Sequence, residues 1–285
     1  MKRIILFRFH SNVAVCRQRL QLLAALNPGV PIYGIYGGDR REYPRIQRAL
    51  RKQLTHCFCI PAIPRPALMR MPLRDMHLHA DDRDGYWKWS HGDLTMRMWY
   101  RAVGKNVPFD VAYLTEWDLL FFQPIEQLYR HVRRDCLGLT GLQPVKVVGI
   151  RWAVTTCEPL RSDYEALMRY ARERHGYHRQ DPLCCFGPGC CFPKTFLEAF
   201  SRIHVPDSSI DEVRIPLFAQ ILGFRMQGTR LCPTWYDMDD FKLFNTNQVN
   251  VPLDALRREL ATPGGRRVFH PFTQRLPQDI LSLYC

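Results

Sequence analysis

The feature that most constrains the fold is a regular alternation of short apolar runs and amphipathic stretches in the N-terminal part of the chain. The expected strands are 3–9, 31–36, 56–60 and 110–115, and the expected helices are 13–26, 42–54 and Asp93 to about Gly104. Consecutive parallel strands need crossovers, which helices supply, so the pattern predicts an α/β fold with a mostly parallel central sheet and helices on both faces. Ligands bind such sheets beyond the carboxyl ends of the strands, which places Ser11, Asp39 and the segment 116–118 on one rim.

The remainder of the chain is less regular in sequence. Helices are expected after Pro124 and at 159–174, 193–202 and 211–223, and strands at 136–141 and 147–155. Hydrophobic residues make up 46% and charged residues 24% of the 285 residues, which is typical of a globular protein and excludes a disordered or coiled-coil chain.

One pair of acidic residues stands out by its context. With 27 acidic residues among 285, pairs two positions apart are expected by chance about 2.5 times. Such pairs occur at Asp82/Asp84, Glu116/Asp118, Asp163/Glu165 and Asp237/Asp239. Glu116 and Asp118 interrupt an otherwise apolar stretch, and burying two carboxylates is costly unless something pairs with them. A divalent cation would do so, and so would arginines, in which the chain is rich; the metal is favoured, with Asp237/Asp239 as the second candidate.

An Asp/Glu-x-Asp motif at a strand end, after a nucleotide-binding β-α-β half, resembles the GT-A-fold glycosyltransferases. In that family the motif holds Mn²⁺ or Mg²⁺ against the diphosphate of a sugar nucleotide. The resemblance covers roughly residues 1–223 in order of elements. It implies one Rossmann-like GT-A domain over 1–285, in which 1–122 bind the nucleotide sugar and 123–285 form the acceptor side and the C-terminal segment.

The resemblance also implies roles for residues on the donor side. Asp118 would be the principal metal ligand. Glu116, which replaces the commoner Asp, would bind metal or the donor ribose, and His270 would complete the metal shell. Arg8 and Ser11, at the end of the first strand, would line the pocket for the base.

Further residues are implied around the donor sugar and the acceptor. Asp39, at the end of the second strand, would contact the base or ribose. Gly187 and Gly189, in a Gly-Pro-Gly loop, would let the chain pass close to the donor sugar or acceptor. Asp211 and Glu212 would supply the catalytic base if the enzyme inverts, and would position the acceptor if it retains.

The resemblance therefore implies a metal-dependent, hexosyltransferase-type enzyme with a UDP-sugar as the favoured donor. The net charge of +13 suits an anionic acceptor, such as a lipid-linked glycan, a polysaccharide or a nucleic acid, although an arginine-rich genome would also explain it. No apolar run reaches the roughly 20 residues of a membrane span, so a cytoplasmic protein is expected, with peripheral membrane contact as an option. The alternatives are a nucleic-acid-binding protein without catalysis, and the same transfer chemistry on a nucleic-acid base.

Cysteine usage points to a reduced compartment. The 11 cysteines are an odd number and no export signal is evident. The cluster Cys184–Cys191 lacks the two-residue spacing of zinc ligands, so buried thiols are favoured over a zinc or redox module.

Overall fold

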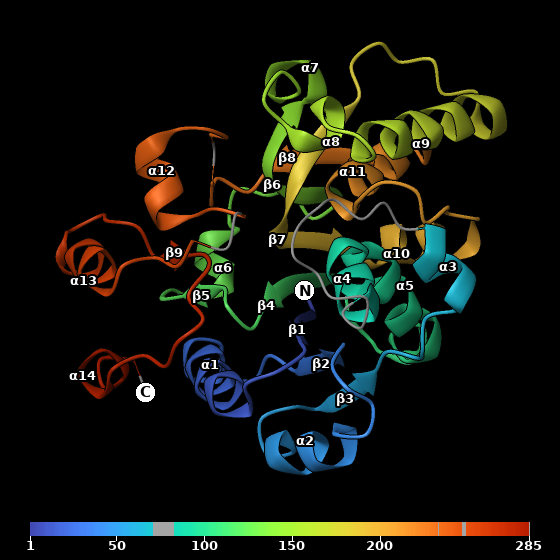
Figure 1. Ribbon diagram of the computed structural model, residues 1–285. Coiled ribbons are helices and arrows are strands. Elements are labelled where there is room, and N and C mark those ends of the chain that lie inside the picture. Colours follow the sequence, from blue (N-terminus) through green and yellow to red (C-terminus); the bar gives the residue numbers. More distant parts are fainter. Residues whose placement is uncertain (71–82, 233, 247–248, 285) are drawn as a thin grey trace.

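The computed structural model describes residues 1–70, 83–232, 234–246 and 249–284 (Figure 1). The strands in these residues are β1 (Arg3–Phe9), β2 (Ile32–Tyr36), β3 (His56–Cys59), β4 (Val111–Glu116), β5 (Leu120–Phe121), β6 (Cys136–Pro144), β7 (Leu183–Pro193), β8 (Arg225–Gly228) and β9 (Val268–Phe269).

The helices fall between these strands and in the C-terminal segment. They are α1 (Val13–Leu26), α2 (Tyr43–Leu50), α3 (Arg65–Arg70), α4 (Arg83–Ser90), α5 (Gly92–Ala102), α6 (Ile125–Leu128), α7 (Val145–Val148), α8 (Ala153–Thr156), α9 (Leu160–His175), α10 (Lys194–Arg202), α11 (Asp211–Ile221), α12 (Met238–Leu243), α13 (Leu253–Ala261) and α14 (Gln278–Leu281), with a 3₁₀ turn at Gly104–Asn106.

The expected α/β class and the mostly parallel sheet are confirmed. Seven strands form the central sheet in the order β3-β2-β1-β4-β7-β6-β8. The β3-β2-β1-β4 half is parallel throughout, and β6 and β8 are also parallel, whereas β7 runs antiparallel to both of its neighbours. Chain order reverses between β1 and β4, which is the switch point where open α/β sheets bind ligands.

Helices cover both faces of this sheet. On one side α1 packs against α2, and on the other α5 packs against α10 and α11 (Figure 1). Right-handed crossovers explain the division, because the chain moves outward from β1 to β3 and then returns past β1 to β4.

A second, two-stranded sheet pairs β5 with β9 in antiparallel register, Leu120 opposite Phe269. This small sheet links the residues that follow Glu116 and Asp118 to the C-terminal segment. This segment, with α12 to α14, lies along one side of the molecule in Figure 1. A separate apolar cluster around Leu120, Phe122 and Phe272 holds it against α1.

Several expected elements are wrong. Residues 147–155 are not a strand, because α7 ends at Val148 and α8 begins at Ala153. The helix expected at 42–54 stops at Leu50. Residues Arg83–Ser90 form α4, which is not among the expected helices. A short apolar run fits helix and strand equally well, which explains the first error.

The Gly-Pro-Gly segment lies in β7, which the sequence did not predict, and not in a loop. Register with β6 jumps from Phe186 to Cys191, so the residues between them form a bulge in the strand. Bulges accommodate a proline that a regular central strand would exclude. Since β7 is buried on both faces, it shows no alternation of polar and apolar residues.

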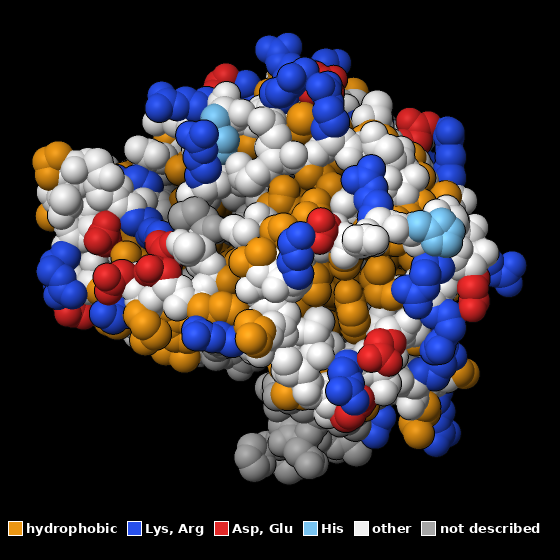
Figure 2. Space-filling model, turned by 90° about the horizontal axis from the view of Figure 1, so that it is seen from above, with side chains coloured by type: hydrophobic (Ala, Val, Ile, Leu, Met, Phe, Trp, Pro, Cys, Tyr) orange, Lys and Arg blue, Asp and Glu red, His pale blue; other side chains and the backbone are white. Residues whose placement is uncertain are grey.

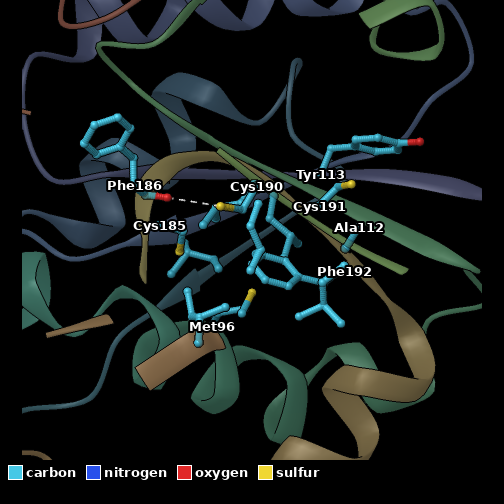
Figure 3. Close-up of a cluster of buried hydrophobic side chains, with 14 of the residues drawn as sticks. Met96, Ala112, Tyr113, Cys185, Phe186, Cys190, Cys191 and Phe192 are labelled. Atoms are coloured by element: carbon cyan, nitrogen blue, oxygen red, sulfur yellow. Dashed lines mark hydrogen bonds between the residues drawn. The ribbon is translucent and has the colours of Figure 1, made fainter. Parts of the chain in front are cut away.

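The cysteine cluster belongs to the hydrophobic core. Cys185, Cys190 and Cys191 are each at most 2% exposed. They lie among Met96 and Phe192, and the Cys190 thiol donates to a backbone carbonyl of β7 (Figure 3). Burial raises the pKa of Cys191 to about 12, so the thiol stays protonated. These are features of packed thiols, as the spacing suggested.

Candidate functional site

Glu116, Asp118 and His270 meet at the switch point of the sheet. One ligand atom from each lies within 4.8 Å of the other two, and no other group of three His, Cys, Asp or Glu side chains does so among the described residues. The side chains are 8%, 17% and 7% exposed, respectively. Ligands of one small divalent ion at about 2.1 Å lie at most about 4.2 Å apart, so small side-chain shifts would close this set around a cation.

Asp118 carries the observation that best fits a cation. Its Oδ1 is buried and accepts no hydrogen bond from any residue that the structure describes. His270 Nε2 lies 3.7 Å away, an ion-pair distance that is too long for a hydrogen bond. Burial alone would raise the pKa of Asp118, but the nearby His270 outweighs it and the pKa is lowered. An anionic oxygen without a donor is the kind of group that a metal ion satisfies.

The backbone explains how His270 reaches this place. Pairing of β5 with β9 brings the C-terminal segment beside the motif, and Phe272 N–H donates to Asp118 O at 2.8 Å. His270 Nδ1 faces Asn245 O at 2.5 Å, so Nδ1 carries the proton and Nε2 is left to act as a ligand.

Arg8 connects the two acidic groups of the site. Its register partner on β4 is Glu116, and the guanidinium pairs with Glu116 Oε1. Its Nη1 also lies 3.6 Å from Asp211 Oδ2. Burial works to lower the pKa of Arg8, but the two carboxylates outweigh it and the pKa is raised. Arg8 is therefore held by carboxylates, whereas the sequence placed it in the base pocket.

Asp211 is enclosed at the N-terminus of α11. Gly92 N–H, at the start of α5, donates to Asp211 Oδ2 at 3.1 Å. A β-carbon on Gly92 would overlap Arg8 Nη1 and would lie 2.5 Å from the same oxygen, so only glycine fits there. Burial raises the pKa of Asp211 to about 7, although Arg8 opposes the shift. With its Oδ2 engaged, Asp211 is poorly placed to meet a substrate.

Glu212 is the more accessible member of the acidic pair. Its side chain is half-buried, and burial together with Asp211 raises its pKa well above the ordinary value. The backbone N–H of Gly187 donates to the Glu212 carboxylate, so the β7 bulge contacts this side chain. Gly189, in contrast, serves the core: it has φ of +77°, and its carbonyl accepts bonds from Tyr129 and Thr140.

Ser11 and Asp39 follow β1 and β2 as expected, but both are exposed. Arg41 pairs with the Asp39 carboxylate at 2.6 Å. Hydrogen bonds from Arg41 lower the pKa of Asp39. Neither side chain belongs to the carboxylate and histidine cluster.

The other acidic pairs have structural partners. Asp237 Oδ1 accepts from two N–H groups as the N-cap of α12, and Asp239 is exposed and pairs with Lys242. Asp163 accepts from Ser209 N–H. Of the remaining pair, Asp82 lies outside the described residues.

A buried ion pair that the sequence did not reveal supports the site. Arg214 of α11 and Asp93 of α5 form a bidentate pair at 2.7 and 2.9 Å, and both side chains are 0% exposed. The pair ties together the two helix N-termini that hold Asp211. The sequence indicated only that a helix begins near Gly92 and Asp93. It gave no sign of the ion pair, because a contact between distant segments leaves no spacing pattern.

One face of the molecule carries both hydrophobic and cationic side chains. Seen from above, the molecule is hollowed, with hydrophobic side chains in the hollow and Lys and Arg side chains around it (Figure 2). In the described part of the chain, no helix is both long and apolar enough to cross a bilayer.

No family model matches this chain, and no curated protein matches it. Among solved structures, it is similar to the bifunctional glycosyltransferase WbbM, with 10% identity, a TM-score of 0.42, and coverage of 95% of this chain and 46% of WbbM. It is also similar to the galactosyltransferase LgtC in complex with donor and acceptor sugar analogs, with 11% identity, a TM-score of 0.38 and coverage of 96% and 84%. Mouse xyloside xylosyltransferase 1 gives 10% identity, a TM-score of 0.36 and coverage of 79% and 84%. This chain thus spans less than half the length of WbbM.

Proposed function

We propose that this chain is a metal-dependent glycosyltransferase of the GT-A type that transfers a hexosyl group from a nucleotide-diphosphate donor, with a UDP-sugar favoured, to a hydroxyl acceptor. The observation that carries the proposal is the convergence of Glu116, Asp118 and His270 beside an unsatisfied, buried carboxylate oxygen at the switch point of the sheet. An oxygen-rich set with one imidazole suits Mn²⁺ or Mg²⁺.

In this proposal Asp118, Glu116 and His270 hold the cation. When bound, it neutralises negative charge on the leaving diphosphate. Arg8 holds Glu116 in place through an ion pair with its Oε1. Asn245 O fixes the tautomer of His270.

Transfer breaks the bond between the anomeric carbon and the diphosphate oxygen, and the electron pair leaves with the diphosphate. The acceptor oxygen forms the new bond to that carbon. If the configuration inverts, Glu212 takes the acceptor proton, because it is the more accessible acid of the pair. If it is retained, Glu212 positions the acceptor. Asp211 orients Arg8 and the start of α5 in both cases.

The acceptor is proposed to be anionic, because the net charge of +13 favours such partners. A lipid-linked glycan, a polysaccharide and a nucleic acid all satisfy this condition. Of the two alternatives that the sequence left open, binding of nucleic acid without catalysis would make no use of the carboxylate and histidine cluster.

Thermal unfolding with UDP, GDP, CMP and dTDP, each with and without Mn²⁺, tests the proposal. A ligand at about 100 times its Kd stabilises the native state by about 2.7 kcal/mol. We expect one nucleotide to raise Tm only with Mn²⁺, and EDTA to reverse the shift. Asp118→Asn should abolish it, whereas Asp239→Asn, the same change at an exposed carboxylate, should keep it.

Two results would contradict this function. A nucleotide shift that is retained with Mn²⁺ in Asp118→Asn would exclude the motif as the metal site. No shift with any nucleotide, combined with steeply salt-dependent DNA or RNA binding that ignores Asp118→Asn, would support the nucleic-acid-binding alternative.

A further inference from the structure

An exposed apolar knob lies at α7 and at the turn before α12. It consists of Val147, Ile150 and Tyr236, which are 57%, 82% and 43% exposed. The knob is one surface, because the Tyr236 hydroxyl donates to Val148 O at 3.2 Å and the Arg151 guanidinium lies 5.9 Å from the Tyr236 ring centroid. Exposed apolar clusters rimmed by cations are typical of interaction sites.

An arginine groove lies beside β6, the strand that leads into α7. This cavity of about 480 Å³ is lined by Arg133, Arg179 and Arg225 over an apolar floor that includes Leu142 and Leu183. None of the described residues that line it is acidic. The groove therefore offers guanidinium groups beside apolar surface, a combination that suits an amphiphilic anion.

The groove and the knob are connected through the backbone of β6, β7 and α7. Leu183 of the groove floor is opposite Pro144 in the strand register next to α7, and Val145 N–H donates to Pro182 O at 2.8 Å. Leu142 likewise lies three residues before the start of α7. In Figure 1 α7 lies at the top of the molecule, so α7 belongs to the face viewed in Figure 2.

Carboxylates near this surface only partly neutralise it. Asp135 pairs with both Arg225 and Arg133 beside the groove. Asp181 pairs with Lys146 of α7 at 2.7 Å. Beside the groove these two carboxylates thus face three cations, and Arg179 adds further positive charge. At the knob, Arg151 is accompanied by the exposed Asp237, which follows Tyr236.

We propose that the apolar knob and the arginine groove together dock this protein on an anionic phospholipid membrane. Val147, Ile150 and Tyr236 would enter the headgroup boundary, and the arginines would contact lipid phosphates. Aliphatic side chains at the tip favour lipid over nucleic acid, whose binding sites offer stacking aromatics and backbone-tracking cations. Docking itself does not depend on the transferase activity.

Flotation with phosphatidylcholine vesicles, with and without phosphatidylglycerol, tests the docking surface in the absence of nucleotide and metal. We expect binding only to the anionic vesicles. The pair Val147→Ser and Ile150→Ser should weaken it at least fivefold, whereas Leu283→Ser, at a residue 72% exposed elsewhere, should not.

A charge-matched pair of variants separates the groove from the general basic surface. Arg179→Gln with Arg225→Gln should weaken binding by about fivefold for each arginine. Arg45→Gln with Arg48→Gln, on the exposed side of α2, removes the same charge and should have a much smaller effect.

Four outcomes would overturn the proposal. They are no binding to anionic vesicles, binding unaffected by the knob variants, equal losses in the two arginine pairs, and a dimer in solution that the knob variants dissociate, which would make a second copy the occupant. If the knob variants retain the Mn²⁺-dependent rise in Tm with nucleotide, membrane docking and the proposed activity are independent of each other.

Discussion

His270 Nε2 lies 3.7 Å from Asp118 Oδ1, and the chain two residues after the histidine bonds back to the backbone of the same aspartate. The side-chain contact is therefore built on a backbone contact. Such a double link keeps the imidazole near the carboxylate when no cation is present. It gives the proposed metal site a preformed geometry.

Removal of the His270 imidazole should lower the affinity of the site for metal without unfolding the protein. We expect His270→Ala to lower the affinity for Mn²⁺ by at least about tenfold, since a direct ligand contributes no less than an outer partner. Isothermal titration with MnCl₂ measures this. His178→Ala, at an exposed histidine, is the control and should bind as the wild type does. Equal affinities in all three proteins would exclude His270 as a ligand.

Gly92 should tolerate no side chain, whereas Gly187, which lies beside the same Asp211 carboxylate, should tolerate one better. In Gly92→Ala the new methyl group would overlap Arg8 and press on Asp211, so we expect a loss of about 1–3 kcal/mol in the free energy of unfolding. Gly187→Ala would place its methyl group 3.5 Å from Asp211 Oδ2, an ordinary contact, and should cost less. Urea unfolding of both variants makes the comparison. If the two lose equal stability, the close packing of Arg8 against Gly92 is wrong.

The buried pair between Asp93 and Arg214 should be sensitive to loss of one partner. Arg214→Met leaves an uncompensated buried carboxylate, at an expected cost of about 3–5 kcal/mol in unfolding free energy. The double change Asp93→Leu with Arg214→Met should recover part of that loss. The exposed pair of Arg161 with Glu158 provides the contrast, since Arg161→Met should cost less than about 1 kcal/mol. A double variant less stable than Arg214→Met would contradict this account.

His91 should make the protein less stable in acid. Burial and then the charge of Arg214 lower its pKa to about 4, against 6.5 when unfolded. The unfolded state therefore binds more protons between these values, and stability is complete above pH 6.5 and falls as the pH drops toward 4. The loss from this group at pH 5 should be about 2 kcal/mol.

Comparison with a variant isolates that contribution. His91→Gln removes the titration, so the stability difference between wild type and variant should shrink as the pH falls from 7 to 5 in urea unfolding. The comparison is needed because Asp211 has the opposite effect. Its pKa is raised to about 7, so the folded protein becomes less stable as the pH rises. A difference that does not change with pH would show that His91 titrates normally.

Elements with a clear local pattern were predicted well. β1, β2 and β4 are apolar runs that end in polar residues, and α1, α9 and α11 have ends within about two residues of those expected. β7 was missed because a strand buried on both faces lacks alternation and its bulge contains Gly-Pro-Gly. The segment 147–155 was assigned to a strand, yet its apolar Val147 and Ile150 face solvent. Apolar character alone did not indicate burial there.

The sequence by itself determined the α/β class, the position of Glu116 and Asp118 at a strand end, and the acids at the start of α11, because each follows from local hydrophobic patterning. Only the tertiary structure decided that Arg8 joins Glu116 to Asp211, that Gly92 makes room for this contact, and that Asp39 faces Arg41. These relationships depend on strand order, on register and on the packing of helix ends. Those features arise from contacts between distant segments, for which the spacing of residues along the chain carries no signal.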